Sequence, residues 1–377
     1  MTVYADNAAT MKPSEIAIQT MLQQMEGGYG NPSALYTLGR DARRTLERAR
    51  AKAARALGAF PDEIFFTSGG TESNNWAIQS TAELYCEKGR HIISTKIEHP
   101  AVLNCLKHLE SHGFSITYLG ADMLGQVSPK QVKDAIRADT ILITIMVSNN
   151  EVGTILPIAD IAGIAVARGV TFHTDAVQSV GHVPVDVKAL NADMLSVSGH
   201  KFGAPRGIGA LYVKRGLKLP PLLHGGGQER GMRSGTEDIP SACAFAAALE
   251  DSVSRLEVTV PQVSAMRDRL IDGLLTISGA HLTGDSRNRL PGIASFAFEG
   301  VESEALVLAL SDCGIYASAG SACSSGVTDA SHVLLAMGIS KELSRGSLRL
   351  SINENNTDEE IDYILQKMPE IITQLRK

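Results

Sequence analysis

The fold is decided by one stretch, Asp193-Met-Leu-Ser-Val-Ser-Gly-His-Lys-Phe-Gly203, in which an apolar run ends in glycine, histidine and lysine. Residues 194–198 predict a short buried strand that breaks at Gly199 and brings His200 and Lys201 to its carboxyl end. Open α/β sheets bind ligands just beyond the carboxyl ends of their strands. A lysine beside an apolar wall there can form a Schiff base with a carbonyl group. A solvated surface lysine is the competing interpretation.

Short apolar runs and amphipathic segments alternate on both sides of this stretch. We expect strands at residues 63–67, 91–95, 115–119, 140–147, 171–174, 194–198 and 209–213. Helices at 72–85, 101–111, 128–138 and 158–168 fall between most of them, and upstream Ser33 is expected to cap an Ala- and Arg-rich helix running to about Leu57. The alternation predicts an α/β fold with a mostly parallel seven-stranded sheet covered by helices on both faces.

The pattern changes after Lys214. The glycine-rich segment 224–236 is a long polar loop, which favours a functional role. Helices at 239–249, 258–278, 302–313 and 330–337, strands at 293–298 and 347–352, and a capping box at Thr357–Glu360 follow it. We therefore expect a large domain at 13–257 and a smaller α+β domain formed by 1–12 and 258–377.

Composition narrows the class of protein. A net charge of -6 without a basic block argues against binding nucleic acid directly. No apolar run reaches the ~18 residues of a membrane span, and the amino terminus lacks a signal-peptide pattern. The five cysteines are an odd number without CxxC spacing, which argues against a metal site and favours a reducing, cytoplasmic location: Cys86, Cys105, Cys243, Cys313 and Cys323.

Several strand ends carry groups that fit one ligand. Residues 68–71 form a glycine turn between a strand and a helix, which predicts either a phosphate site or a plain tight turn. Asp175 and Asn150 follow two further strands, and Lys201 follows a third. Pyridoxal phosphate needs an amine for its aldehyde, backbone donors for its phosphate and a carboxylate for its ring nitrogen. Together these residues favour that cofactor.

Four motifs carry a resemblance to a known family: His173-Thr-Asp-Ala-Val-Gln178, Ser198-Gly-His-Lys201, Thr67-Ser-Gly-Gly-Thr-Glu-Ser-Asn-Asn75 and Arg233-Ser-Gly-Thr236. They resemble the class V aminotransferase superfamily. Within it, Ser318-Ala-Gly-Ser-Ala-Cys323 is similar to the cysteine desulfurases of the NifS/IscS type. The likeness runs from Tyr4 to Arg349 and implies the type I fold of pyridoxal phosphate-dependent transferases.

The resemblance implies a role for each matching residue. Lys201 holds the cofactor as a Schiff base, His99 stacks on its ring and acts in catalysis, and Asp175 pairs with its ring nitrogen. Gln178 and Asn150 address the ring oxygen, while Asn31 and Arg349 bind the substrate carboxylate. The phosphate is held by Gly70, Thr71, Ser198 and His200, and by Thr236 from the neighbouring subunit of a homodimer.

Cys323 is implied as the nucleophile. A thiol with a pKa near ~8.5 supplies some thiolate at neutral pH, and thiolates are strong nucleophiles. It would take the sulfur of L-cysteine as a persulfide, release L-alanine and pass the sulfur to a protein acceptor, either an iron–sulfur scaffold or a tRNA-thiolation enzyme. The stretch 324–329 favours the subgroup with a longer cysteine loop, and Ser331-His332 departs from the more usual Ser-Tyr.

Two other functions stay open at this point. A selenocysteine lyase or an aminotransferase on the same fold would keep its activity without Cys323. A non-catalytic scaffold would not need Lys201, Asp175 and Cys323 together, so their presence argues against it.

Overall fold

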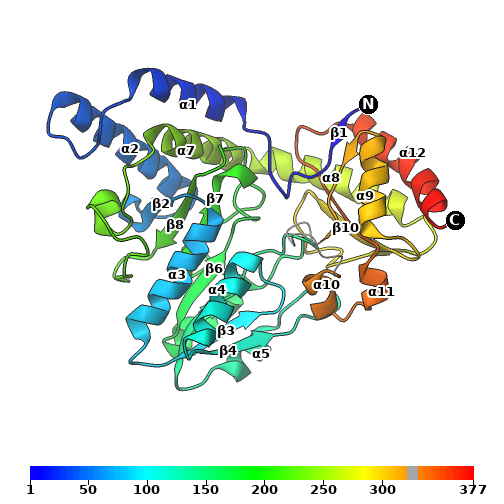
Figure 1. Cartoon of the computed structure of the whole chain (residues 1–377), viewed down its shortest axis with the longest axis horizontal. Helices are drawn as coiled ribbons and strands as arrows, with labels where there is room; N and C mark the ends of the chain where they lie inside the picture. Colours follow the sequence, from blue (N-terminus) through cyan, green and yellow to red (C-terminus); the bar gives the residue numbers. More distant parts are fainter. Residues whose placement is uncertain (321–329) are drawn as a thin grey trace.

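The structure is a computed structural model that describes residues 1–320 and 330–377. Its centre is a seven-stranded sheet in which only β8 runs against its neighbours. The strand order is β2 (Ile64–Thr67), β8 (Gly209–Val213), β7 (Met194–Ser198), β6 (Thr171–Asp175), β5 (Thr140–Thr144), β3 (His91–Thr95) and β4 (Ser115–Leu119). The expected α/β class with a mostly parallel seven-stranded sheet is therefore confirmed (Figure 1).

Helices cover both faces of this sheet because successive side chains of a strand point to opposite faces. In β2, Phe66 joins the core formed with α1 (Glu15–Gly27), α2 (Thr37–Ala56), α6 (Ile158–Arg168) and α7 (Ile239–Ser254). The adjacent Phe65 belongs to a separate core with α3 (Gly70–Tyr85) and α4 (Pro100–Ser111). α5 (Pro129–Ala135) begins at a capping box formed by Ser128.

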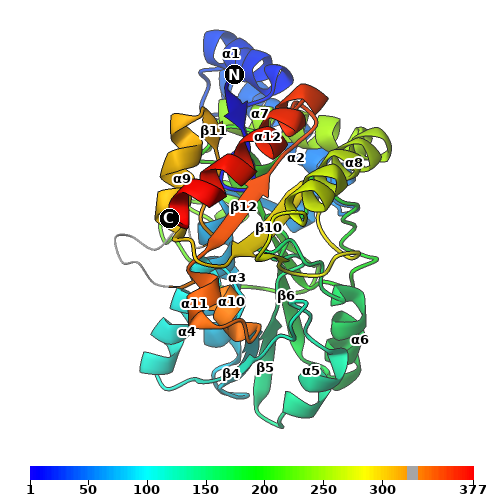
Figure 2. The same cartoon turned by 90° about the vertical axis from the view of Figure 1, so that its right-hand side faces the viewer.

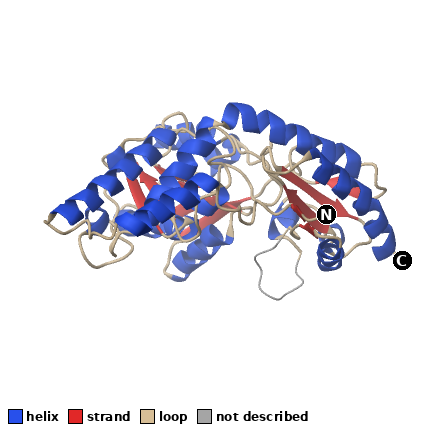
Figure 3. Cartoon of the chain, turned by 90° about the horizontal axis from the view of Figure 1, so that it is seen from above, coloured by secondary structure: helices blue, strands red, loops and turns tan. Residues whose placement is uncertain are grey.

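A second group of strands lies beside the large sheet, as Figure 3 shows. β10 (Ile293–Phe298) pairs antiparallel with β12 (Ser347–Ser351) and β9 (Ala280–Leu282), and β1 (Val3–Tyr4) pairs with β11 (Ile315–Tyr316). α8 (Leu256–Leu274), α9 (Ser303–Asp312) and α12 (Asp358–Leu375) pack on them around a core of their own, with the amino terminus alongside (Figure 2). The domain division at 13–257 and at 1–12 with 258–377 stays a prediction.

Some expected boundaries were wrong. Ser33 does not cap α2, because the Asn31 side chain accepts its N–H and keeps it in the loop; the helix begins at Thr37. The strand expected at 140–147 ends as a ladder at Thr144, although Val147 N still donates to the Asp175 carbonyl at 2.9 Å. The helix expected to reach 138 ends at Ala135 because Ile136 is extended. No described helix has both the length and the apolarity to cross a membrane.

Candidate active site at the carboxyl edge of the sheet

Four strand ends meet at one edge of the large sheet. β5, β6 and β7 are parallel, and β2 runs in the same direction as β7 because both are antiparallel to β8. Asp175 ends β6, and β7 leads into the short 3-10 helix Gly199–Lys201. β2 leads into the first turn of α3, which starts at Gly70. The topology therefore gathers the motifs that the sequence separates by more than a hundred residues.

Lys201 lies where the amino-terminal turn crosses this edge. Its Nζ donates to the carbonyl oxygens of Ala8 at 2.6 Å and Ala9 at 2.8 Å. Gln178 Nε2 donates to the same Ala8 carbonyl at 2.9 Å. His182 Nε2 donates to the Lys201 carbonyl at 2.7 Å, which fixes the backbone behind the amine. Lys201 and Gln178 thus donate to the same carbonyl oxygen, which places the two side chains side by side.

Asp175 is a buried carboxylate whose two oxygens are both held. Asn74 Nδ2 donates to Oδ2 at 2.6 Å, and the Val177 N–H donates to Oδ1 at 2.9 Å. Asn74 comes from α3, one turn beyond Gly70, so the helix that begins at the glycine turn also orients the carboxylate. A buried carboxylate fixed in this way suits an ion pair with a protonated ring nitrogen.

Two histidines flank these groups. Burial lowers the pKa of His99, while the charge of Asp175 raises it and those of Lys201 and His332 lower it. His99 caps α4, where its Nδ1 accepts the Ala101 N–H at 3.1 Å. This bond leaves a neutral ring with its proton on Nε2. Burial, then the charges of Lys201 and Arg206, lower the pKa of His200 to about 4. Both rings are therefore neutral near pH 7.

The first turn of α3 forms an anion cradle. Its leading backbone N–H groups have no partner within the helix, and no described side chain caps them. A Cβ on Gly70 would lie 2.6 Å from Val177 Cγ2 and 3.4 Å from Ser198 Cβ, so only glycine fits beside β7. Thr71 is exposed on this turn. The turn thus presents donors and a positive dipole end where the phosphate was predicted.

Arg349 lies in β12 and reaches the same edge from the second sheet. Its Nη1 donates to the Asn150 carbonyl at 2.8 Å, and its Nη2 to Asp6 Oδ1 at 2.9 Å. Ser318 Oγ also donates to Asp6 Oδ1, at 2.7 Å. Arg349 is 3% exposed, and its Nε has no partner among the described residues. No described hydrogen bond joins Asn31, which is exposed in the loop before α2, to another predicted site residue.

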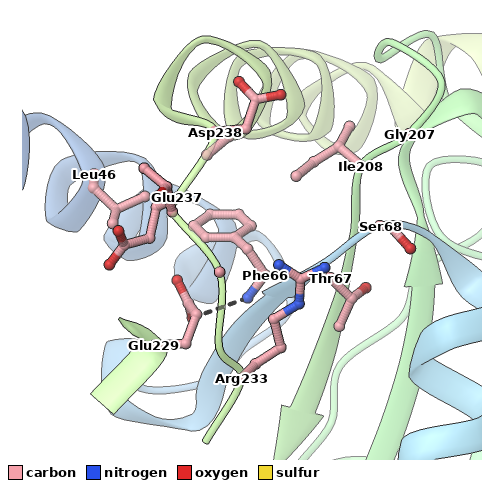
Figure 4. A pocket seen from close by; sticks show the side chains of 13 residues that line it. Leu46, Phe66, Thr67, Ser68, Gly207, Ile208, Glu229, Arg233, Glu237 and Asp238 are labelled. Carbon is pink, nitrogen blue, oxygen red and sulfur yellow. Dashed lines mark hydrogen bonds between the residues drawn. The ribbon is translucent and has the colours of Figure 1, made fainter. Parts of the chain in front are cut away.

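Thr236 lines a pocket that also includes Ser68, next to the turn that starts α3. Arg233 lines the same pocket, in which Ser68 and Arg233 can be followed in Figure 4. Gly70, Ser198 and His200 are not among its lining residues. Glu72 of α3 accepts two bonds from Arg233, at 2.8 and 3.0 Å. The loop that carries Thr236 is thereby tied to the helix of the anion cradle.

The predicted nucleophile, Cys323, lies outside the described residues. Burial raises the pKa of the Cys105 and Cys243 thiols to about 11 each, so both stay protonated near pH 7. Because the thiolate and not the protonated thiol is the nucleophile, neither Cys105 nor Cys243 is a candidate for this role. The described residues contain no group of three or more His, Cys, Asp or Glu side chains that could hold a metal ion.

The donor set fits pyridoxal phosphate. The edge brings together an amine, a buried carboxylate and an uncapped helix start whose Gly70 position a Cβ would fill. This fold and site define a pyridoxal phosphate-dependent enzyme. The profile of the aminotransferase class-V family matches residues 3–364, so the chain belongs to that family. Pyridoxal phosphate is the cofactor of this family.

Curated relatives match along nearly the whole chain. A protein named cysteine desulfurase IscS from Methanosarcina thermophila is 50% identical over 374 residues, covering 99% of this chain and 93% of the relative. A protein of the same name from Clostridium botulinum is 45% identical over 378 residues, covering 100% and 95%. A solved NifS-like protein superposes with a TM-score of 0.94 at 38% identity, covering 99% of this chain and all of that one.

Three parts of the site were missed by the sequence analysis. Asn74 was quoted in a motif without a role, although its place one helical turn after Gly70 was a usable signal. The Ala8 carbonyl, which accepts from Lys201 and Gln178, carries no side-chain signal. The link from Arg349 to Asp6 joins residues 343 positions apart, and only the assembled fold reveals it.

Proposed function

We propose that this protein is an L-cysteine desulfurase, which removes sulfur from L-cysteine and leaves L-alanine. The observation that carries the proposal is the convergence of Lys201, Asp175 and Arg349 on one sheet edge, in a chain up to 50% identical to curated cysteine desulfurases. The amine would bind the cofactor aldehyde, the carboxylate would pair with the ring nitrogen, and the guanidinium would bind the carboxylate of an amino-acid substrate. A solved relative with a TM-score of 0.84 and 36% identity is described as SspA in complex with cysteine.

The chain's own residues prepare the reaction. The Arg349 guanidinium is fixed by Asn150 and Asp6, and its buried Nε keeps hydrogen-bonding capacity for a substrate carboxylate. Asp175 would pair with the protonated ring nitrogen of pyridoxal phosphate, and the bound cofactor would supply an electron sink for the substrate carbon. The neutral His99 ring, whose Nδ1 is occupied by the Ala101 N–H, has its Nε2 proton to donate.

The net transfer balances without an added oxidant. The carbon–sulfur bond of L-cysteine breaks, and the Cys323 thiolate takes the sulfur to form a persulfide. The electron pair of the broken bond stays with the carbon skeleton, which gains protons and leaves as L-alanine. The persulfide sulfur then passes to a protein acceptor, for which an iron–sulfur scaffold and a tRNA-thiolation enzyme are the two proposed classes.

We place the enzyme in the cytoplasm as a homodimer. The segment from α1 to the start of α2 exposes large apolar side chains, among them Met25, Tyr29, Leu35, Tyr36 and Leu38. Exposed large apolar side chains concentrated on one segment favour an interface, and a second copy of the chain is the partner that we propose. In a dimer, the exposed Thr236 of one subunit could contribute to the anion cradle of the other subunit. The pocket that Thr236 lines in its own subunit does not include Gly70.

The test is the product pattern from defined amino acids. Cofactor-loaded protein with L-cysteine and a thiol reductant should release L-alanine and sulfide in equal amounts. Amino-group transfer from L-cysteine to an added 2-oxo acid would show an aminotransferase instead. Turnover of L-selenocysteine with L-cysteine inert would show a selenocysteine lyase. Light scattering across a concentration series tests the dimer, and a persistent monomer would contradict it.

A further inference from the structure

The residue before His99 is fixed by its own side chain. Glu98 is fully buried, and its Oε1 accepts the Thr95 hydroxyl at 2.7 Å and the Met146 N–H at 3.1 Å. Thr95 ends β3, and Met146 lies just beyond β5. The Glu98 side chain therefore ties the turn that carries His99 to two strands of the large sheet.

The Glu98 backbone carbonyl is held by a distant residue. His332 begins α10 (His332–Ala336), and its Nε2 donates to this carbonyl at 3.0 Å across 234 positions of sequence. The carbonyl belongs to the peptide unit that ends at the His99 Cα, and a peptide unit is planar. A donor on its oxygen therefore also fixes the direction of the His99 N–H and the place of its Cα.

The protonation of His332 suits this contact. Burial lowers its pKa, the bond to the Glu98 carbonyl raises it, and the charge of Lys107 in α4 lowers it further. The ring is therefore neutral near pH 7, and its proton is on Nε2, because a carbonyl oxygen only accepts. The other nitrogen, Nδ1, lies 4.0 Å from Glu151 Oε1.

The short helix α10 keeps His332 in place. Ser331 caps it by accepting the Leu334 N–H at 3.2 Å. Val333 and Leu334 are 0% and 1% exposed and share a core with Ile97, two residues before His99. The ring cannot leave the carbonyl without disturbing this core. Because histidine stands here in place of the more usual tyrosine, the contact is a feature of this sequence.

We propose that His332 is a positioning residue that orients His99 through the Glu98–His99 peptide. The inference rests on the proposed function, in which the His99 ring supplies a proton, and it adds a residue from α10. Loss of the donor should let His99 tilt and slow the chemical step, because proton transfer depends steeply on geometry. Substrate binding at Arg349 should be kept.

The test compares three substitutions of His332 in cofactor-loaded protein. His332→Phe keeps a ring without an N–H, and the side chain of His332→Asn is too short to reach the carbonyl. We expect both to lower kcat by about 5-fold, the size of one hydrogen bond between neutral groups, with KM for L-cysteine within about 2-fold. His332→Gln keeps a donor and should recover most of kcat. All three should fold, since the side chain is 39% exposed.

A second readout needs no turnover. Visible circular dichroism of bound pyridoxal phosphate reports the asymmetry around its ring, on which His99 is expected to stack. His332→Phe and His332→Asn should change this band, and His332→Gln should preserve it. A purely structural role of His332 would lower the urea midpoint and leave the band unchanged.

A double variant identifies the route. If His332 acts through His99, adding His332→Phe to His99→Gln should not lower the residual kcat further. The matched control is His281→Phe in β9. The His281 side chain is 47% exposed and hydrogen-bonds Glu299 at 2.8 Å, away from the sheet edge of the site. This control should leave both kcat and the cofactor band unchanged.

Three results would overturn the inference: a kcat and a cofactor band of His332→Phe equal to those of the wild type, an undiminished loss in the His99→Gln background, or no recovery with His332→Gln. Wild-type protein that does not turn over L-cysteine would instead refute the proposed function. The cofactor band would still decide the role of His332, so the two failures are distinguishable.

Discussion

Replacing Arg50 by methionine should destabilise the protein strongly, because it leaves a buried charge without its partner. Arg50 in α2 donates to both carboxylate oxygens of Glu229, at 2.6 and 2.8 Å, and to the Ile64 carbonyl at 2.9 Å. The two side chains are 2% and 3% exposed. Glu229 also accepts the Phe66 N–H, so its carboxylate ties the loop that carries Thr236 to β2 (Figure 4).

Removal of one partner of such a buried pair lowers the free energy of unfolding by about 3–5 kcal/mol. Equilibrium urea unfolding followed by circular dichroism would measure the shift in midpoint between wild type and Arg50→Met. The double variant Arg50→Met/Glu229→Gln removes the stranded charge and keeps an acceptor for the Phe66 N–H. It should be more stable than Arg50→Met alone.

The matched control is Arg215→Met. Arg215 pairs with Asp62 at 2.6 Å, the same separation, but the two side chains are 54% and 53% exposed. An exposed pair contributes at most about 1 kcal/mol, so this variant should unfold near the wild-type midpoint. Equal effects of Arg50→Met and Arg215→Met would refute the reasoning that burial, and not the ion pair itself, sets the magnitude.

Three further changes test the site and the core. Lys201→Ala should abolish covalent attachment of pyridoxal phosphate, seen as loss of its protein-bound absorbance band; retention of that band would contradict the role of this amine. Asp175→Asn should lower kcat by at least about 100-fold with the fold intact, because it removes a preorganised charge; near-normal turnover would exclude the ion pair. Burial lowers the pKa of His173 from 6.5 to about 3. Between these two pKa values the unfolded chain binds a proton at His173 that the folded protein does not. The free energy of unfolding should therefore fall by about 1.4 kcal/mol for each unit by which the pH is lowered below about 6.5. Urea midpoints of wild type and His173→Gln between pH 5 and 7 check this slope, and equal slopes would refute it.

Much of the fold could be predicted because its signals are local. Eight of the nine expected strands match within one residue at each end, such as 194–198 before Lys201, since each is a short apolar run between turn residues. The capping box at Thr357 marked the start of α12 correctly. Ser33 failed as a cap because it lies in a turn before the helix, where Asn31 Oδ1 accepts its N–H, and α2 begins only at Thr37.

The site could be predicted only as far as motifs name its residues. Lys201, Asp175 and Gly70 follow strands, so their meeting at one sheet edge follows from the parallel topology. The residues that hydrogen-bond to these side chains could not be predicted in the same way. Asn74 on Asp175 and Asp6 on Arg349 depend on how helices and a second sheet pack against that edge, which no local pattern encodes.

The most direct test of the proposed function compares wild type with Cys323→Ala. Both proteins, loaded with pyridoxal phosphate, would be given L-cysteine and a thiol reductant, and L-alanine would be measured over time. The account predicts sustained L-alanine release by the wild type and almost none by Cys323→Ala, although both keep the bound cofactor. Equal release by both proteins would remove Cys323 from the chemistry and contradict the desulfurase mechanism.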